Sequence, residues 1–145
     1  MSAIAVIAKA PIAGRSKTRL CPPCTPHQAA ALAAAALQDT LRVVSQTPVE
    51  RRLLVLHGSY PTPFGFESIA QRGDGLAERL ANAFEDAGGP LLLIGMDTPQ
   101  VTPELLAHGI ELLRSHRGCS GRRQTAAIGR SACSARTRAS SPTCR

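Results

Sequence analysis

The chain has 145 residues, of which 43% are hydrophobic and 3% aromatic, and this length suffices for one domain with a core of Leu, Ile, Val and Ala. No run is long and apolar enough to span a bilayer, and no basic segment precedes the apolar N-terminus as in a secretory signal, so we expect a cytoplasmic protein without membrane partners. The net charge of +7 comes entirely from residues 117–145, which contain seven Arg and no acid, whereas residues 1–116 are neutral.

Residues 1–71 alternate between strand and helix patterns. Ala3–Ala8 is an aliphatic run typical of a buried parallel strand. Thr25-Pro26-His27-Gln28 has the capping-box pattern that opens a helix, which we expect to continue to about Ser45. Arg52–His57 predicts a second strand, and Glu67–Gln71 a short third one.

The same alternation continues to residue 116. Gly73-Asp74-Gly75 turns the chain into a helix with the sequence LAERLANAFEDA, and Gly88-Gly89 ends it. Pro90–Gly95 is a further strand, and Thr102-Pro103 opens the last helix. This order predicts an α/β fold with three α/β/α layers around a mostly parallel sheet.

A basic loop leaves the end of the first predicted strand, where ligands bind in open α/β sheets. Its cations can neutralise a di- or triphosphate, and its glycine lets the backbone approach one. These residues are Lys9, Gly14, Arg15, Lys17 and Arg19. The loop is not a Walker P-loop, because the glycine lies two residues too early. On spacing alone, a solvated basic turn explains the loop equally well.

Asp97 follows the strand Pro90–Gly95 and is predicted to lie at the same rim. A carboxylate there can hold Mg²⁺ or Mn²⁺ together with phosphate oxygens. Cations and a metal suit a reaction that releases a nucleoside diphosphate or pyrophosphate, with a nucleotide sugar or nucleoside triphosphate as substrate. A turn former before Pro99 explains Asp97 at least as well. No catalytic base and no oligomeric state is indicated.

Cys21-Pro22-Pro23-Cys24 has the spacing of a zinc or redox pair. A structural zinc site needs two further ligands, and the other three cysteines lie in the tail. The four histidines show no ligand spacing. We therefore interpret the pair as two incidental thiols in a Pro-rich loop.

Three segments in register, KAPIAGRSKTRL, QRGDGLAERLANAF and LLLIGMDTP, resemble a bacterial family of glycosyltransferase-like proteins. That family belongs to the nucleotide-diphospho-sugar transferase superfamily and to its radical-SAM-associated group. The resemblance covers roughly residues 3–115 and implies a GT-A-like fold. It implies glycosyl transfer from a nucleotide-diphosphate sugar. Guanylyltransferases of cofactor biosynthesis have a similar loop, so nucleotidyl transfer is the alternative.

The resemblance also implies roles for individual residues. The four cations of the basic loop would face the nucleotide phosphates, and Asp97 would stand in the metal-binding acidic motif. Gly73 and Asp74 match the second motif and would contact the nucleotide or the sugar.

The tail departs from the family. Members continue with a strand and a motif resembling DGGYW, whereas this chain reads RGCSGRRQTAAIGRSACSARTRASSPTCR. We expect this composition to form no core strand. The reading frame can be shifted so that each new codon takes the third base of one codon and the first two bases of the next. With third bases that the genetic code permits, Gly118–Cys133 then reads VLGPAADGGYWAIGL. We therefore predict a frameshift near Ser115–Gly118.

The predicted organisation is therefore a transferase-like domain at 1–116, incomplete at its C-terminus, and a disordered Arg/Ser/Ala-rich tail at 117–145. Missing strands would leave the product unstable or inactive. A third interpretation, beside glycosyl and nucleotidyl transfer, is therefore a non-catalytic remnant of a transferase. The tail can bind polyanions non-specifically, but it has no aromatic residues for stacking, so no specific nucleic-acid partner is expected.

Overall fold

The computed structural model describes residues 1–115, 118–120 and 126–130. These residues form three α-helices, one short 3-10 helix and six strands. In chain order they are β1 Ala3–Lys9, η1 Thr18–Leu20, α1 Pro26–Gln46, β2 Arg51–His57, β3 Glu67–Ala70, α2 Leu76–Ala87, β4 Pro90–Gly95, α3 Pro103–Ser115, β5 Gly118–Ser120 and β6 Ala126–Arg130. None of the helices in this part of the chain has the length and hydropathy needed to cross a membrane.

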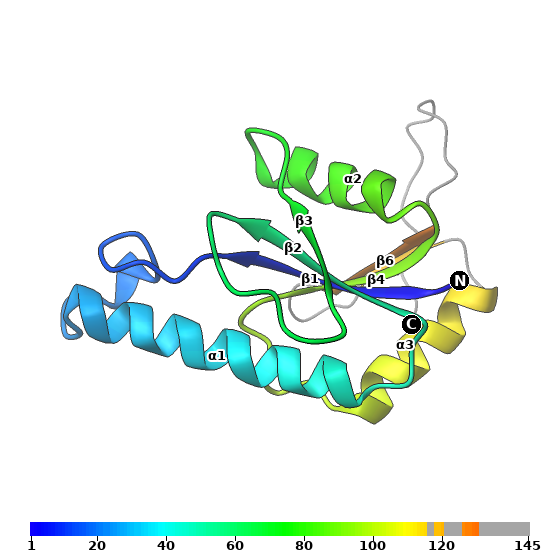
Figure 1. Ribbon diagram of the computed structural model, residues 1–145, viewed down its shortest axis with the longest axis horizontal. Helices are drawn as coiled ribbons and strands as arrows, with labels where there is room; N and C mark the ends of the chain where they lie inside the picture. Colours follow the sequence, from blue (N-terminus) through cyan, green and yellow to red (C-terminus); the bar gives the residue numbers. More distant parts are fainter. Residues whose placement is uncertain (116–117, 121–125, 131–145) are drawn as a thin grey trace.

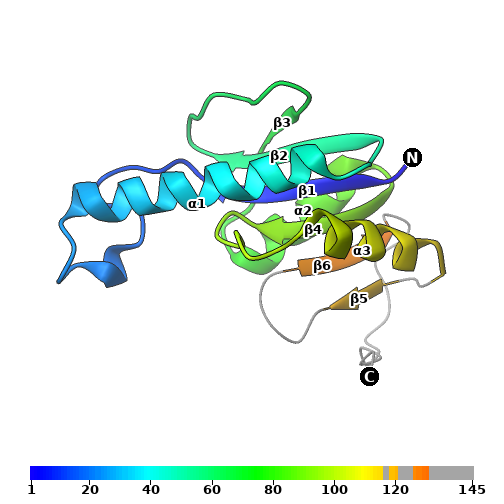
Figure 2. The ribbon, with the colours of Figure 1, turned by 90° about the horizontal axis from the view of Figure 1, so that it is seen from below.

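The strands form one sheet in the order β3-β2-β1-β4-β6-β5 (Figures 1 and 2). β1 pairs in parallel with β2 and β4, and β3 pairs in parallel with β2. β6 is antiparallel to β4, and β5 is antiparallel to β6. The predicted mostly parallel sheet is therefore confirmed.

Helices cover both faces of the sheet, as the sequence predicts for three layers. α1 and α3 lie on one face and α2 on the other (Figures 1 and 2). Side chains alternate along β1 accordingly: Ile4 and Val6 join the core under α1 and α3, whereas Ala3 and Ala5 face α2. On the α2 face, Ala83 and Ala87 of the helix belong to one buried cluster with Ala3 and Ala5 of β1, and larger residues such as Leu53 and Leu91 of the neighbouring strands complete it.

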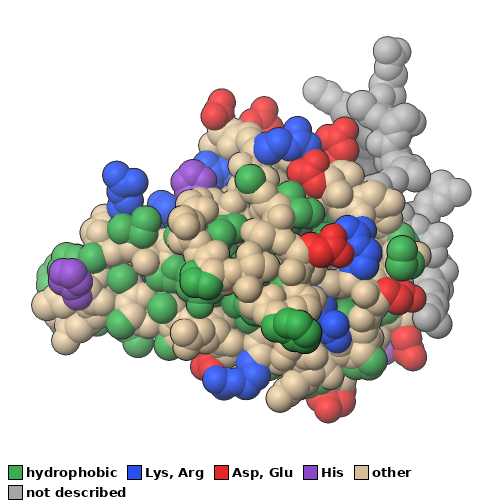
Figure 3. Space-filling view, in the orientation of Figure 1, with side chains coloured by type: hydrophobic (Ala, Val, Ile, Leu, Met, Phe, Trp, Pro, Cys, Tyr) green, Lys and Arg blue, Asp and Glu red, His purple; other side chains and the backbone are tan. Residues whose placement is uncertain are grey.

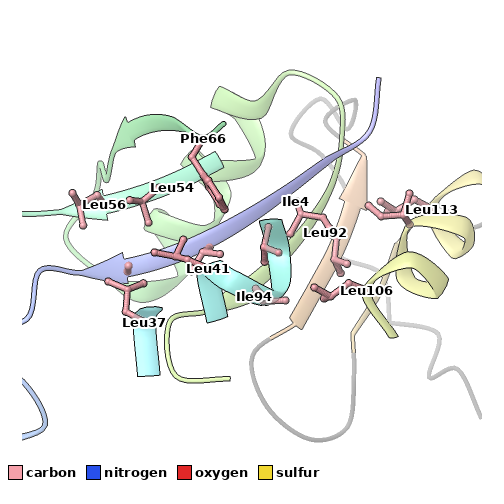
Figure 4. Packing of buried hydrophobic residues seen from close by; sticks show 14 residues of the cluster. Ile4, Leu37, Leu41, Leu54, Leu56, Phe66, Leu92, Ile94, Leu106 and Leu113 are labelled. Atoms are coloured by element: carbon pink, nitrogen blue, oxygen red, sulfur yellow. The ribbon is translucent and has the colours of Figure 1, made fainter. Parts of the chain in front are cut away.

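The larger core lies between the sheet and the two helices on the other face. Figure 4 shows Leu106 and Leu113 of α3 beside Leu92 and Ile94 of β4. These side chains are at most 3% exposed. Leu37 and Leu41 of α1 belong to the same cluster. This core fixes β1 and β4 against α1 and α3.

The predicted helix start and stop signals form as expected. The Thr25 hydroxyl accepts a hydrogen bond from the Gln28 amide at 3.2 Å, and the Gln28 side-chain oxygen accepts one from the Thr25 amide at 2.9 Å. This capping box opens α1. Gly88 ends α2 in the left-handed conformation, with φ of 66°.

One expectation about the tail is wrong. The structure places two strands, β5 and β6, in the segment that the sequence predicts to form none, and β6 pairs with β4 from Ala126 to Arg130. The physical reason is that a ladder is made by backbone groups, which a segment poor in Leu and Val still carries. The remaining residues of 117–145 lie outside the described part, so the predicted disorder and frameshift stay predictions.

Candidate functional site

The carboxyl ends of the four parallel strands meet at one rim of the sheet. The register aligns Lys9 of β1 with His57 of β2, and Ile7 with Gly95 at the end of β4. Each strand is followed there by a connecting segment, and the one after β1 is the basic loop. Lys9 is the last residue of β1, and the other site residues predicted from the sequence belong to these segments. Figure 3 shows Lys and Arg side chains at the end of the molecule where the basic loop lies.

Ser16 organises the basic loop from inside. Its hydroxyl oxygen accepts a hydrogen bond from the Ile12 amide at 2.9 Å, and its side chain is buried. The Ile12 carbonyl in turn accepts from the amides of Arg15 and Ser16. Gly14 has φ of 77°, which this tight turn requires. The loop is therefore a closed turn with a fixed backbone.

The cations of the loop differ in their surroundings. The Lys9 ammonium donates to the Arg15 carbonyl at 3.4 Å, within the loop itself. The guanidinium groups of Arg15 and Arg19 form no ion pair among the residues the structure describes, and both residues are exposed. Arg15 and Arg19 are therefore open to an anionic ligand.

Lys17 and Asp97, 80 residues apart in sequence, are in direct contact. The Lys17 Nζ lies 3.1 Å from Asp97 Oδ2, with 30% and 51% of the two side chains exposed. The expected meeting of the basic loop with the carboxylate after β4 is thus present in the structure. Lys17 also has φ of 46° and ψ of 42°, in the left-handed region.

The turn that carries Asp97 is held on both sides. The Thr98 hydroxyl donates to the Gly95 carbonyl at 2.7 Å. The Thr40 hydroxyl of α1 shares its proton between the Ala36 carbonyl of its own helix at 2.8 Å and the Met96 carbonyl at 3.1 Å. Both threonines are buried. The backbone at Asp97 is therefore anchored to the end of β4 and to α1 before any ligand arrives.

The second predicted motif is folded onto the start of α2. Gly73 has φ of 109°, and a Cβ added there would lie 2.8 Å from the Glu78 Cβ, so this position requires glycine. The Glu78 carboxylate accepts from the Asp74 amide at 2.9 Å, and Arg79 donates to the Gly73 carbonyl at 3.0 Å. Side chains of α2 thus fix the backbone of Gly73 and Asp74.

The preceding residue, Arg72, is anchored to the same helix. Its carbonyl accepts from the Asn82 side chain at 2.9 Å, and its guanidinium lies 2.5 Å from Asp86. The hydrogen bond with Asp86 raises the pKa of Arg72 above its ordinary value. The segment from Arg72 to Asp74 is therefore clamped to α2 at several points along its backbone.

The chain matches the family described as "Uncharacterized protein conserved in bacteria (DUF2064)" over residues 9–126. The chain belongs to this family. The match includes the basic loop, the second motif and the Asp97 turn.

Comparison with solved structures gives the fold independently. A protein from Desulfovibrio desulfuricans G20, named "putative nucleotide-diphospho-sugar transferase", is similar with a TM-score of 0.69 and 24% sequence identity. The similarity covers 81% of this chain and 56% of that one, so this chain spans little more than half of the other protein. The two share their fold. No curated protein matches the chain.

Several residues that shape the rim could not be predicted from the sequence. Ser16, Thr40 and Gln71 are polar, yet their roles depend on partners that only the fold brings near. The Gln71 side chain, for example, donates to the carbonyls of Ala8 and Val55 at 2.6 and 3.0 Å. The one signal in the sequence for a role of Gln71 was its position at the start of the second motif.

Other thiols and carboxylates add no second site. Cys21 and Cys24 are free thiols of intermediate exposure. Within the described residues, no group of three or more His, Cys, Asp or Glu side chains could hold a metal ion. A groove of about 520 Å³ lies between α1 and the segment after β2, lined among others by Arg42, Tyr60 and Phe64. It contains none of the predicted site residues.

Proposed function

We propose that the rim binds a nucleotide-diphosphate sugar with a divalent metal, and that the family's chemistry is glycosyl transfer. The observation that carries the proposal is the contact between Lys17 of the basic loop and Asp97 after β4. It brings a cation-rich turn and a carboxylate together at the carboxyl ends of parallel strands, where α/β sheets bind ligands. The solved relative's name supports a nucleotide-sugar substrate.

The residues fit Mg²⁺ or Mn²⁺ when phosphate completes the coordination. Asp97 offers one half-exposed carboxylate on an anchored turn. Mg²⁺ keeps several waters and binds through one or two carboxylates plus substrate phosphates, so a complete protein cage is not needed. When bound, the metal would neutralise charge on the departing diphosphate.

The chain's own residues would position the diphosphate and stabilise its charge. Arg15 and Arg19 are exposed and form no ion pair in the described chain, so they can bind phosphate oxygens without breaking an existing one. Gly14 leaves space for a phosphate against the backbone, since nothing lies within 4 Å of a Cβ added there. Gly73 and Asp74 would contact the nucleotide or sugar from a backbone that α2 holds in place.

A second candidate, nucleotidyl transfer from a nucleoside triphosphate, rests on the number of cations. The loop carries four Lys or Arg residues within Lys9–Arg19, which matches the charge of a triphosphate as well as that of a diphosphate. The two candidates differ in whether CTP or GTP binds more tightly than a diphosphate sugar.

Thermal shift and calorimetry on the full chain test the proposal. UDP- and GDP-sugars, CTP and GTP are added in turn with Mg²⁺ or Mn²⁺, and a ligand at 100 times its Kd should stabilise the fold by about 2.7 kcal/mol. Arg15→Gln should weaken binding, whereas Arg42→Gln, which removes an equal charge on α1 beside Asp39, should not. If none of these ligands raises the Tm of the folded chain, the proposal fails and the non-catalytic reading stands.

A further inference from the structure

Lys17 occupies the carboxylate that the proposed metal needs. Its Nζ lies 3.1 Å from Asp97 Oδ2. An ammonium and a divalent cation at the same oxygen repel each other, so they compete for Asp97. The ion pair is half exposed to solvent, and pairs of this kind are weak enough to be exchanged for a stronger partner.

The backbone around Lys17 is fixed in an unusual conformation. Lys17 is the one non-glycine residue with positive φ in the described part of the chain. Its carbonyl accepts from the Leu20 amide at 2.9 Å, and the neighbouring Ser16 is buried and hydrogen-bonded within the loop. Non-glycine residues stay in this region where the surroundings over-determine them. The attachment point of the Lys17 side chain is thus fixed by the loop and does not depend on the ion pair.

The backbone next to Asp97, the ion-pair partner of Lys17, is also fixed. Thr40 and Thr98 hold the carbonyls of Met96 and Gly95 on the N-terminal side of Asp97. With both backbones held, exchange of partners at Asp97 requires side-chain motion alone. A phosphate group that binds the basic loop offers Lys17 an alternative anion close to its present one.

We propose that Lys17 is an internal cation that keeps the metal off Asp97 until a phosphate ligand draws the ammonium away. Metal and nucleotide then bind in a coupled manner: the nucleotide frees Asp97 and also supplies oxygen ligands to the ion. The nucleotide part of this inference rests on the proposed function, whereas the competition between Lys17 and a metal for Asp97 does not.

Mn²⁺ binding without nucleotide tests the competition directly. Free Mn²⁺ is measured by electron paramagnetic resonance in titrations of the full chain and its variants. Lys17→Met should bind Mn²⁺ about threefold to tenfold more tightly than the unaltered chain. Arg19→Met is the matched control, because it removes the same charge from the same loop without breaking an ion pair in the described chain. It should gain less than twofold.

Two further variants make the result unambiguous. Lys17→Gln repeats the test with a polar side chain, and circular dichroism confirms that each variant is folded. The double variant Lys17→Met with Asp97→Asn should lose the gain in Mn²⁺ affinity. The inference is overturned if Lys17→Met and Lys17→Gln bind Mn²⁺ no better than the unaltered chain, if Arg19→Met gains as much, or if the gain survives without Asp97.

A second arm adds UDP, GDP or CTP to the unaltered chain. A nucleotide that binds should raise its Mn²⁺ affinity, and this increase should be smaller in Lys17→Met, where Asp97 is already free. An increase equal in both overturns the coupling. If no nucleotide binds, the proposed function fails, while the metal-only titrations still decide whether Lys17 and the metal compete.

Discussion

Gln71 and Ala8 join the ends of two strands that are not neighbours in the sheet. The Gln71 side-chain amide donates to the Ala8 carbonyl at 2.6 Å and to the Val55 carbonyl at 3.0 Å. Its backbone amide donates to the Leu56 carbonyl at 2.9 Å, which extends the β2–β3 ladder by one residue. The residue that opens the second motif therefore anchors the strand end from which Lys9 and the basic loop begin.

Replacing Gln71 by Met should destabilise the rim, because it keeps the side-chain length and removes both donors. We expect a loss of about 1–3 kcal/mol in the free energy of unfolding, measured by urea denaturation. Gln38→Met, at an exposed position of α1, is the control and should change little. Equal stability of the two variants would show that these carbonyls do not need Gln71.

Thr40 should matter for the Asp97 turn beyond its own helix. Its hydroxyl lies 2.8 Å from the Ala36 carbonyl and 3.1 Å from the Met96 carbonyl, so Thr40→Val removes a link between α1 and β4. We expect a cost of about 1–3 kcal/mol and faster hydrogen exchange of the amides after β4.

Thr47→Val supplies a matched control for that experiment. Thr47 is also buried, but among the described residues its hydroxyl donates only to the Val43 carbonyl, four residues earlier, at 3.0 Å. Its loss should cost about 1 kcal/mol and leave exchange after β4 unchanged. Faster exchange near Asp97 in both variants would argue against a specific role for Thr40.

The fold and the meeting of Lys17 with Asp97 at one rim were predictable, because periodicity and caps are local signals. Aliphatic runs, the Thr25–Gln28 capping box and Gly88 place strands and helices, and parallel order places strand ends at one rim. The rim then brings Lys17 and Asp97 into one region without any knowledge of packing.

The shape of the site was not predictable from local patterns. A buried threonine such as Thr40 looks in sequence like any helical threonine, and only the packed α1–β4 interface gives it the Met96 carbonyl as a partner. No local pattern predicts the left-handed backbone of Lys17 or the distance of 3.1 Å from its Nζ to Asp97 Oδ2. The strand β6 depends on backbone pairing with β4, which composition does not report.

Gly73 should tolerate no side chain. With φ of 109° and a Cβ position 2.8 Å from the Glu78 Cβ, Gly73→Ala combines backbone strain with a clash. We expect a cost of about 2–4 kcal/mol, and displacement of Glu78 from the Asp74 amide. Gly65→Ala isolates the strain, because Gly65 has φ of 80° but open space around it, and should cost about 1 kcal/mol. Similar losses of stability in the two variants would mean that α2 shifts to make room for the added carbon.

Stability should fall in acid partly through Glu67. Arg51 forms two hydrogen bonds to this carboxylate across β2 and β3, at 3.1 and 2.9 Å, and they lower the pKa of Glu67. A lowered pKa in the folded state stabilises the fold at any pH above the unfolded value, and this contribution is lost as the pH falls through the folded value. Glu67→Gln should therefore lower the Tm slightly at neutral pH and not in strong acid.

Thermal melts between pH 7 and pH 2 measure this dependence. Glu85→Gln is the control, because its carboxylate lies 3.9 Å from Arg72 and is largely exposed. Its Tm should follow that of the unaltered chain at every pH. A Glu67→Gln difference that persists unchanged at the acid end would assign the effect to packing and not to the charge.

The reading frame of the tail is testable in the gene. A frameshift near Ser115–Gly118 predicts that related genes encode the string VLGPAADGGYWAIGL where this chain has Gly118–Cys133. Sequencing the gene across these codons in several isolates tests this prediction. An intact frame that encodes the Arg-rich tail in all of them would refute the prediction.

Restoring that frame should strengthen the proposed metal site, because of the register of β6. In the shifted frame the aspartate of DGGYW is encoded immediately before the codons of Ala126–Arg130. Ala126 pairs with Ile94, and antiparallel pairing puts the start of β6 where β4 ends. We expect an aspartate encoded just before this strand to lie at the rim that carries Asp97, and two carboxylates hold a divalent ion better than one. We expect the frame-restored chain to bind Mn²⁺ at least about tenfold more tightly than the 145-residue chain, with the gain lost when that aspartate is changed to asparagine. Equal affinity in the two chains would place the shifted-frame aspartate away from Asp97 and leave the metal dependent on Asp97 and phosphate alone.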